Sequence, residues 1–237
     1  MQRTLTPELM DDPHVPPDQL ALSLRFIRAV NRALGGTSAL LRHLKAWSVN
    51  WPRNEPITLL DIATGSADLP LAAYRWARRR GYELRITAID KHAETLSLAG
   101  KHIGNAPIRL LNADALTLDR TFQPNSFDYV HAGLFLHHLK DDEIITVLRH
   151  MHTLASRGII WNDLVRSPAA RRVIRLLTTG MPHIVQHDAR VSVDAGFTRE
   201  EAEALTSRAG ITYAAYSWRP LTHRFTIAGE KPPVLTR

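Results

Sequence analysis

The sequence of 237 residues contains no cysteine, which excludes a disulfide scaffold, a thiolate zinc site and a cysteine nucleophile. It also has no apolar run near the roughly 20 residues that cross a bilayer. The opening residues, MQRTLTPELMDD, lack the apolar core of a secretory signal. We therefore expect no membrane insertion and a cytoplasmic location.

The composition that remains is that of a globular protein, with 44% hydrophobic and 22% charged residues. The formal net charge of +7 comes from dispersed arginines, with local clusters such as Arg78, Arg79 and Arg80 at the end of a predicted helix. A net positive charge of this size is typical of proteins that bind nucleic acids and also of enzymes that bind small anionic ligands. Charge alone therefore selects no partner.

Hydrophobic periodicity divides the chain into an N-terminal helical cap, residues 1–56, and an α/β domain, residues 57–237. Within the cap, Leu20, Leu24, Ile27 and Leu34 follow helical spacing up to Gly35-Gly36. From Ile57 onward, short apolar runs alternate with amphipathic segments. The predicted strands are 58–62, 84–89, 108–111, 127–132, 158–161, 212–218 and 224–228. This alternation predicts a seven-stranded, mostly parallel sheet with helices on both faces.

The segment of about 164–197 interrupts the alternation and is predicted to form a helical lid. Residues 168–179 have the pattern of a basic amphipathic helix, whereas MPHIVQHDARVS, residues 181–192, is predicted to be irregular. Thr198 and Glu201 then form a capping-box pattern that predicts the start of a helix.

Ligands of an open parallel sheet bind beyond the carboxyl ends of its strands, so the residues there indicate the chemistry. Asp90, at the end of the second strand, can accept hydrogen bonds from both hydroxyls of a ribose. Asp114 can accept from an adenine amino group while the amide of Ala115 meets a ring nitrogen. Asp61 can hold an ammonium, and the small turn after it lets backbone approach a ligand. This order of features suits adenosine joined to an amino acid.

Four motifs carry a resemblance to class I S-adenosylmethionine-dependent methyltransferases: LLDIATGSADLP, TAIDKH, NADALTL and FDYVHAGLFLHHLKDD. The sequence is most similar to the small-molecule branch that includes the ubiquinone and menaquinone enzymes. The resemblance implies a Rossmann-like fold and S-adenosylmethionine as cofactor. The cofactor-binding residues that it implies are Asp61, Ala63, Thr64, Gly65, Asp90, Lys91, Asp114 and Ala115.

The first motif departs from the family pattern, because Ala63 and Ala67 replace the outer two of three glycines. If either position needs positive φ, alanine costs roughly 1–2 kcal/mol. S-adenosylmethionine has no pyrophosphate for a glycine-rich cradle to wrap, so the loss is tolerable here. The same substitution argues against NAD.

His137 and His138 are the predicted catalytic residues, because they follow the fourth strand, where the resembling family presents the methyl group. Leu136-His137-His138-Leu139 is similar in its first two positions to the Leu-His-Asp-Trp segment of small-molecule O-methyltransferases. Complete proton transfer to a histidine of pKa about 6.5 is unfavourable by about 5 kcal/mol from a phenol and by about 12–13 kcal/mol from an alkyl alcohol. This favours phenols, enols and carboxylates as acceptors.

No metal is predicted. His183 and His187 lie four residues apart, but Pro182 and the expected irregular backbone weaken a shared site. Asn162-Asp163 is similar to a metal-holding pair of catechol-type enzymes, yet the matching acid after the fourth strand is missing.

We therefore expect O-methylation of a small phenolic, aromatic or polyketide-like acceptor. C- or N-methylation stays open. An RNA methyltransferase is favoured only by the net charge, and nucleic acid is not an expected partner because no motif for a flipped base is present. A non-enzymatic scaffold has the altered glycine turn as its sole support. The oligomeric state, including a homodimer, is open.

Overall fold

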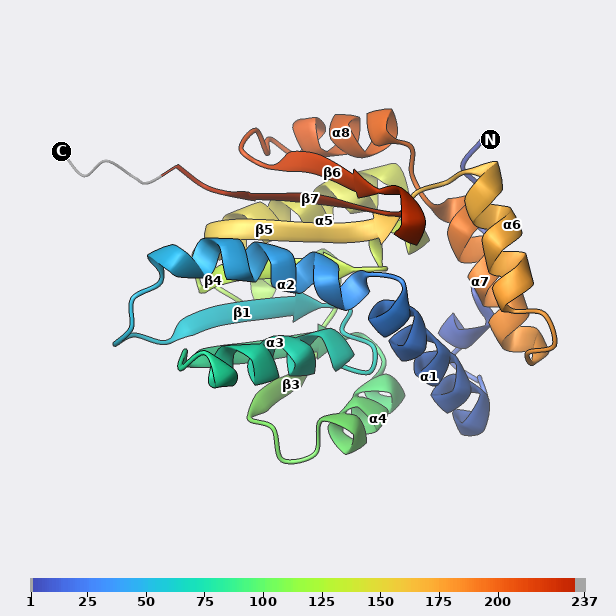
Figure 1. Ribbon diagram of the computed structural model, residues 1–237, viewed down its shortest axis with the longest axis horizontal. Coiled ribbons are helices and arrows are strands. Elements are labelled where there is room, and N and C mark those ends of the chain that lie inside the picture. Colours follow the sequence, from blue (N-terminus) through green and yellow to red (C-terminus); the bar gives the residue numbers. More distant parts are fainter. Residues whose placement is uncertain (1, 233–237) are drawn as a thin grey trace.

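A computed structural model describes residues 2–232 (Figure 1). Its sheet has the strands β1 (Ile57–Ile62), β2 (Leu84–Asp90), β3 (Ile108–Asn112), β4 (Phe127–Gly133), β5 (Ala155–Leu164), β6 (Ala215–Arg219) and β7 (Arg224–Glu230). Their order is β3-β2-β1-β4-β5-β7-β6. The first five pair in parallel, and β7 runs antiparallel to both β5 and β6. The predicted seven-stranded, mostly parallel sheet is confirmed.

Two helical layers bury the sheet. One consists of α2 (Gly36–Trp47), α3 (Asp68–Arg79) and α4 (Ala93–Ile103), and the other of η3 (Ala115–Arg120), α5 (Asp141–Leu154) and α8 (Arg199–Arg208). Leu59 and Leu60 of β1 belong to different core clusters, because successive side chains of a strand point to opposite faces. Leu40 and Leu44 of α2 join the cluster of Leu59. The division of the chain at residue 56 stays a prediction.

A third group of helices covers the carboxyl ends of the strands. It consists of η1 (Leu9–Asp11), α1 (Pro17–Ala33), α6 (Pro168–Leu177) and α7 (His183–Ala195), and α7 contacts η1, α1, α6 and η4 (Leu136–His138). In Figure 1 the arrowheads of β1 and β5 point toward α1, α6 and α7. Two short segments, η2 (Ser48–Asn50) and η5 (Pro220–Thr222), complete the described elements.

The irregular backbone predicted for residues 181–192 is wrong, because α7 runs through it. Pro182 precedes the helix, and a proline at that end removes no helical hydrogen bond. Ile184, Val185 and Val193 of α7 are buried. The capping box is confirmed: Thr198 N donates to Glu201 Oε2 at 2.9 Å, and Glu201 N donates to Thr198 Oγ1 at 3.3 Å.

Candidate functional site

A crevice of about 470 Å³ lies at the carboxyl ends of β1, β2 and β4. It contains every residue that the sequence proposed for the cofactor and both proposed catalytic histidines. These are Asp61, Ala63, Thr64, Gly65, Asp90, Lys91, Asp114, Ala115, His137 and His138. Residues from four separate segments therefore meet in one cavity, as the strand-end argument predicted.

The turn after β1 uses left-handed backbone at three alternating positions. The φ angles are 52° at Ala63, 56° at Gly65 and 53° at Ala67. The backbone thus keeps the shape for which the family pattern supplies glycines, and two alanines carry its cost of roughly 1–2 kcal/mol each. Thr64 N fixes the turn by donating to Ile89 O at 2.8 Å.

Asp90 joins this turn to the end of β2. Its Oδ2 accepts from the amide of Gly65 at 3.1 Å, and its Oδ1 accepts from the amide of His92 at 3.0 Å. Burial raises the pKa of Asp90, although the two amides oppose that shift. Each carboxylate oxygen keeps acceptor capacity, so the side chain can still meet hydroxyl groups in the crevice.

Asp61 is paired inside the protein. Its Oδ1 lies 2.5 Å from Nδ1 of His131, the residue directly opposite on β4, and both side chains are buried. His131 Nε2 has no hydrogen-bond partner among the described residues, and the side chain lines the crevice. Sequence reasoning missed His131, although a histidine within the apolar strand FDYVHAG was the available signal.

Asp114 has a local partner, because its carboxylate caps η3 by accepting from Leu116 N at 2.9 Å. It still lines the crevice together with Ala115 and Lys91. The carbonyl oxygen of Lys91 accepts from Asn112 Nδ2 at 2.9 Å, which ties the end of β2 to β3. The adenine role of Asp114 stays a prediction.

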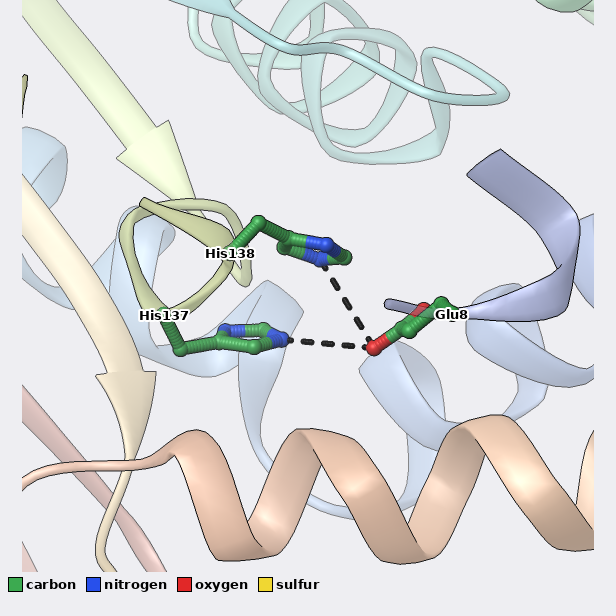
Figure 2. A group of neighbouring side chains, drawn as sticks. All are labelled: Glu8, His137 and His138. Carbon is green, nitrogen blue, oxygen red and sulfur yellow. Dashed lines mark ion pairs between the residues drawn. The ribbon is translucent and has the colours of Figure 1, made fainter. Parts of the chain in front are cut away.

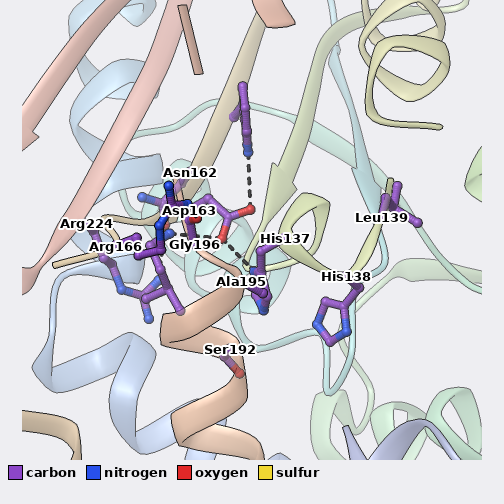
Figure 3. Close-up of polar contacts among 12 residues, drawn as sticks. His137, His138, Leu139, Asn162, Asp163, Arg166, Ser192, Ala195, Gly196 and Arg224 are labelled. Carbon is purple, nitrogen blue, oxygen red and sulfur yellow. Dashed lines mark hydrogen bonds and ion pairs between the residues drawn. The ribbon is translucent and has the colours of Figure 1, made fainter. Parts of the chain in front are cut away.

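His137 and His138 lie in η4 with their rings 4.3 Å apart, centroid to centroid. The Nδ1 atom of each ring is held by a carboxylate, His137 by Asp163 at 2.6 Å and His138 by Asp11 at 2.9 Å. Figure 3 shows His137 facing Asp163. The Nε2 atoms of both rings face Glu8 Oε1, at 3.6 Å from His137 and 3.7 Å from His138 (Figure 2).

The carboxylates change the electrostatics of His137. Burial opposes its charged form, but Asp163 and Glu8 outweigh burial and raise the pKa of His137 to about 10. Burial alone would raise the pKa of Glu8, but the interactions of Glu8 with the two histidines lower it. These partners therefore favour the charged, imidazolium form of His137. The predicted role as a base therefore requires that one carboxylate be displaced or neutralised.

A second cavity, of about 110 Å³, adjoins the crevice and is mainly apolar. Its walls come from α1, α6 and α7, with Phe26, Val30, Ile174 and Val185 among the lining side chains. The residues that line both cavities are Glu8, Met10, Ile27, Leu134, His137, His138 and Ser192. The two histidines therefore stand at the boundary between a polar crevice and an apolar chamber.

The N-terminal segment closes one side of the crevice, and Arg3 anchors it. The guanidinium donates to the carbonyl oxygens of Ala195 at 3.0 Å and Leu139 at 2.8 Å, and it pairs with Asp141 at 2.8 Å. It also lies 4.6 Å from the ring centroid of Phe197. Glu8 and Asp11, which sequence reasoning missed, follow in this segment, which Asp188 also holds by accepting from the amides of Leu9 and Met10.

Two comparisons with known proteins find that the central segment is similar to methyltransferases. Residues 59–158 match the model of a methyltransferase domain family. An uncharacterized methyltransferase of Mycobacterium tuberculosis (strain ATCC 25618 / H37Rv) is 38% identical over 101 residues, 42% of this chain and 46% of the relative. The chain thus spans just under half the length of the curated relatives it matches.

Two solved structures extend the likeness to the fold. The CurJ carbon methyltransferase is 14% identical with a TM-score of 0.68, over 93% of this chain and 62% of that one. The plantazolicin methyltransferase BpumL, solved in complex with SAH, is 14% identical with a TM-score of 0.60, over 91% and 96%. The ubiquinone and menaquinone branch stays a prediction.

Proposed function

We infer that this chain, whose residues 59–158 match a methyltransferase domain family, is a class I enzyme that transfers a methyl group from S-adenosylmethionine to a small molecule. The observation that carries this proposal is the pair of adjoining cavities that meet at His137 and His138. One cavity has the polar groups for an adenosyl amino acid, and the other has the apolar walls for an acceptor. The methyl donor, when bound, supplies an electrophilic methyl carbon on a sulfonium.

The crevice fits this cofactor at several points. Asp90 offers its carboxylate to a ribose, and the left-handed turn around Gly65 brings backbone close to the ligand. Two buried atoms without a hydrogen-bond partner among the described residues, Thr64 Oγ1 and His131 Nε2, also belong to residues lining the crevice. Buried polar atoms normally have partners, so these two are suited to polar groups of a ligand.

The residues of the chain act by binding and orientation. The apolar chamber holds the acceptor so that its reacting atom faces the crevice, and a fixed geometry of this kind can contribute roughly 7–11 kcal/mol. The lid of α6 and α7 and the N-terminal segment exclude water from the reacting groups.

Among the described residues, no helix has the length and apolarity needed to cross a membrane.

The acceptor that we propose is a phenolic, aromatic or polyketide-like molecule methylated on oxygen. The imidazolium of His137 favours an acceptor oxygen that carries or develops negative charge. The carbon methyltransferase among the structural neighbours supports methylation on carbon as the second candidate. An enolate fits both candidates, because its charge is shared between oxygen and carbon.

The test is a panel of phenols, enols, quinones and amines, incubated with labelled S-adenosylmethionine and scored by product mass. Thermal shift with S-adenosylmethionine comes first, because a ligand that binds only the native state must raise the melting temperature. We expect His137→Asn to lower turnover and to leave SAH affinity near normal. No thermal shift, or no labelled product from any acceptor, would contradict the proposal. RNA binding with a steep salt dependence would favour an RNA substrate instead.

A further inference from the structure

The boundary between the two cavities has the donor set of a metal site. Glu8, His137 and His138 each offer one ligand atom, and these atoms all lie within 4.8 Å of one another (Figure 2). Two imidazole nitrogens and a carboxylate oxygen form a ligand set that first-row transition metals accept. The three residues come from two distant segments, one N-terminal to α1 and one after β4.

The orientation of the imidazoles is set from outside the cluster. Asp163 and Asp11 accept from the Nδ1 atoms of His137 and His138, which leaves both Nε2 atoms directed at Glu8. Histidines that bind a metal almost always donate their other ring N–H to such a partner. Asp163 is itself fixed, because it accepts from Trp161 Nε1 at 3.2 Å and from Leu164 N at 2.9 Å.

The distances inside the cluster suit a bridging cation better than hydrogen bonds. Separations of 3.6 Å and 3.7 Å between Nε2 and Glu8 Oε1 are too long for a hydrogen bond. Ligands at 2.0–2.1 Å around a tetrahedral zinc ion stand about 3.3 Å apart, so a small inward movement would complete the coordination. His137 Nε2 is buried and has no hydrogen-bond partner among the described residues.

The local charge also favours a cation. The carboxylates of Glu8, Asp11 and Asp163 face the two rings, and Asp188 accepts from the amides of Leu9 and Met10, next to Glu8. Burying several carboxylates together is costly unless positive charge compensates them, and a bound cation would supply that charge in place of the proton on His137.

We propose that Glu8, His137 and His138 bind one divalent transition-metal cation of the zinc, cobalt or iron type. Magnesium and calcium are disfavoured, since they prefer oxygen ligands. Three protein ligands leave a coordination position open at the boundary of the two cavities. Resting on the proposed function, that position would take the acceptor oxygen and lower its pKa.

The direct test uses tag-free protein treated with a chelator and then titrated with Co²⁺, followed by its visible absorption. We expect one Co²⁺ per chain, displaced by Zn²⁺ and not by Mg²⁺. Glu8→Gln and His138→Gln should abolish the tight site. Asp11→Asn should weaken it by about 10–100-fold, the usual effect of losing a partner that orients a ligand.

The matched control is His183→Gln, which removes an exposed histidine outside both cavities, whose ring lies 6.0 Å from that of His187 on α7. This variant should keep the stoichiometry and affinity of the wild-type chain. Absence of stoichiometric Co²⁺ binding, or binding that survives both Glu8→Gln and His138→Gln, would overturn the proposal.

If a variant does not fold, ¹⁵N-histidine spectra of the control variant give the answer without altering the site. Zn²⁺ must move two Nε2 resonances, and spectra without that change would overturn the site. Metal binding and SAH binding are measured separately, by titrating each ligand alone. Loss of one with retention of the other therefore distinguishes a failed metal site from a failed methyltransferase assignment.

Discussion

The amide of Gly65 donates to Asp90 Oδ2 at 3.1 Å, and this bond joins the turn after β1 to the end of β2. The two residues lie 25 positions apart in the chain. The carboxylate proposed to bind the ribose therefore also shapes the turn over which the ligand would lie. A substitution of Asp90 should therefore weaken ligand binding in two ways, because it removes the proposed contacts with the ribose and also loosens the turn around Gly65.

Asp90→Ala should weaken SAH binding by about tenfold to more than a hundredfold. Hydrogen bonds to a charged acceptor contribute about 1.5–3 kcal/mol each, and 1.4 kcal/mol corresponds to a factor of ten. Isothermal titration calorimetry measures the affinity. Asp119→Ala, at an exposed carboxylate outside the crevice, is the control and should bind normally. Equal affinities for the Asp90 variant and the wild-type chain would contradict the ribose assignment.

Ala63→Gly should raise the free energy of unfolding by up to about 1 kcal/mol. The substitution removes the left-handed penalty of roughly 1–2 kcal/mol, part of which the greater freedom of glycine in the unfolded chain offsets. Ala67→Gly should be close to neutral, because Ala67 is fully buried and its methyl group contributes about 0.8 kcal/mol. Urea unfolding monitored by circular dichroism compares the variants.

Gly81→Ala provides the reverse comparison. Gly81 has φ 73° and no heavy atom within 4 Å of an added Cβ, so the substitution changes backbone preference without a clash. We expect it to lower the free energy of unfolding by about 1 kcal/mol. A stabilising Gly81→Ala together with a destabilising Ala63→Gly would show that the left-handed penalty does not operate in this chain.

The parts of the site that lie at strand ends could be predicted, because a parallel sheet brings those ends together whatever the loops do. Asp90, the turn at Gly65 and the histidines of η4 all follow from that rule, and they line one crevice. The alternation of strands and helices predicted the sheet itself for the same reason. Strand order and connection rules leave few alternatives.

The parts that depend on the path of a distant segment could not be predicted. Glu8 and Asp11 lie beside His138 in the fold but about 130 positions from it in the sequence, 127 in the case of Asp11. No local pattern around MQRTLTPELMDD indicates that contact. The helix α7 was missed because its buried positions are interrupted by polar residues that face the N-terminal segment, such as Ser192 and Asp188.

Stability should decrease between about pH 6.5 and pH 4 partly because of His43. Burial, followed by the charge of Arg42, lowers the pKa of His43 to about 4, and Arg42 Nη2 lies 3.2 Å from its Nε2. The unfolded chain takes up a proton near pH 6.5 while the folded chain does not, so acid favours unfolding over this range. The contribution of His43 is fully present above pH 6.5 and is lost as pH falls toward 4.

His43→Gln should therefore reduce the difference in the free energy of unfolding between pH 7 and pH 5. Only that difference counts, because the substitution also removes the ring contact with Trp47 and lowers stability at both pH values. His183→Gln, at an exposed position of α7, should leave the difference unchanged. An identical pH dependence in wild type and His43→Gln would refute the assignment.

Arg3→Ala should release the N-terminal segment from the cavity boundary. The substitution removes hydrogen bonds to two carbonyl oxygens, the pair with Asp141 and the contact with Phe197. A loss of about 1.5–3 kcal/mol in local stability corresponds to a tenfold to hundredfold rise in the open population. Cleavage after Glu8 by a glutamate-specific protease follows that population when opening and closing are fast. The cleavage rate should rise by the same factor.

Arg53→Ala is the matched control, because Arg53 lies 4.4 Å from the ring centroid of Tyr82 and donates to Arg80 O at 3.2 Å, on a surface outside both cavities. Equal cleavage rates for the two variants would mean that Arg3 does not hold Glu8 against the histidines.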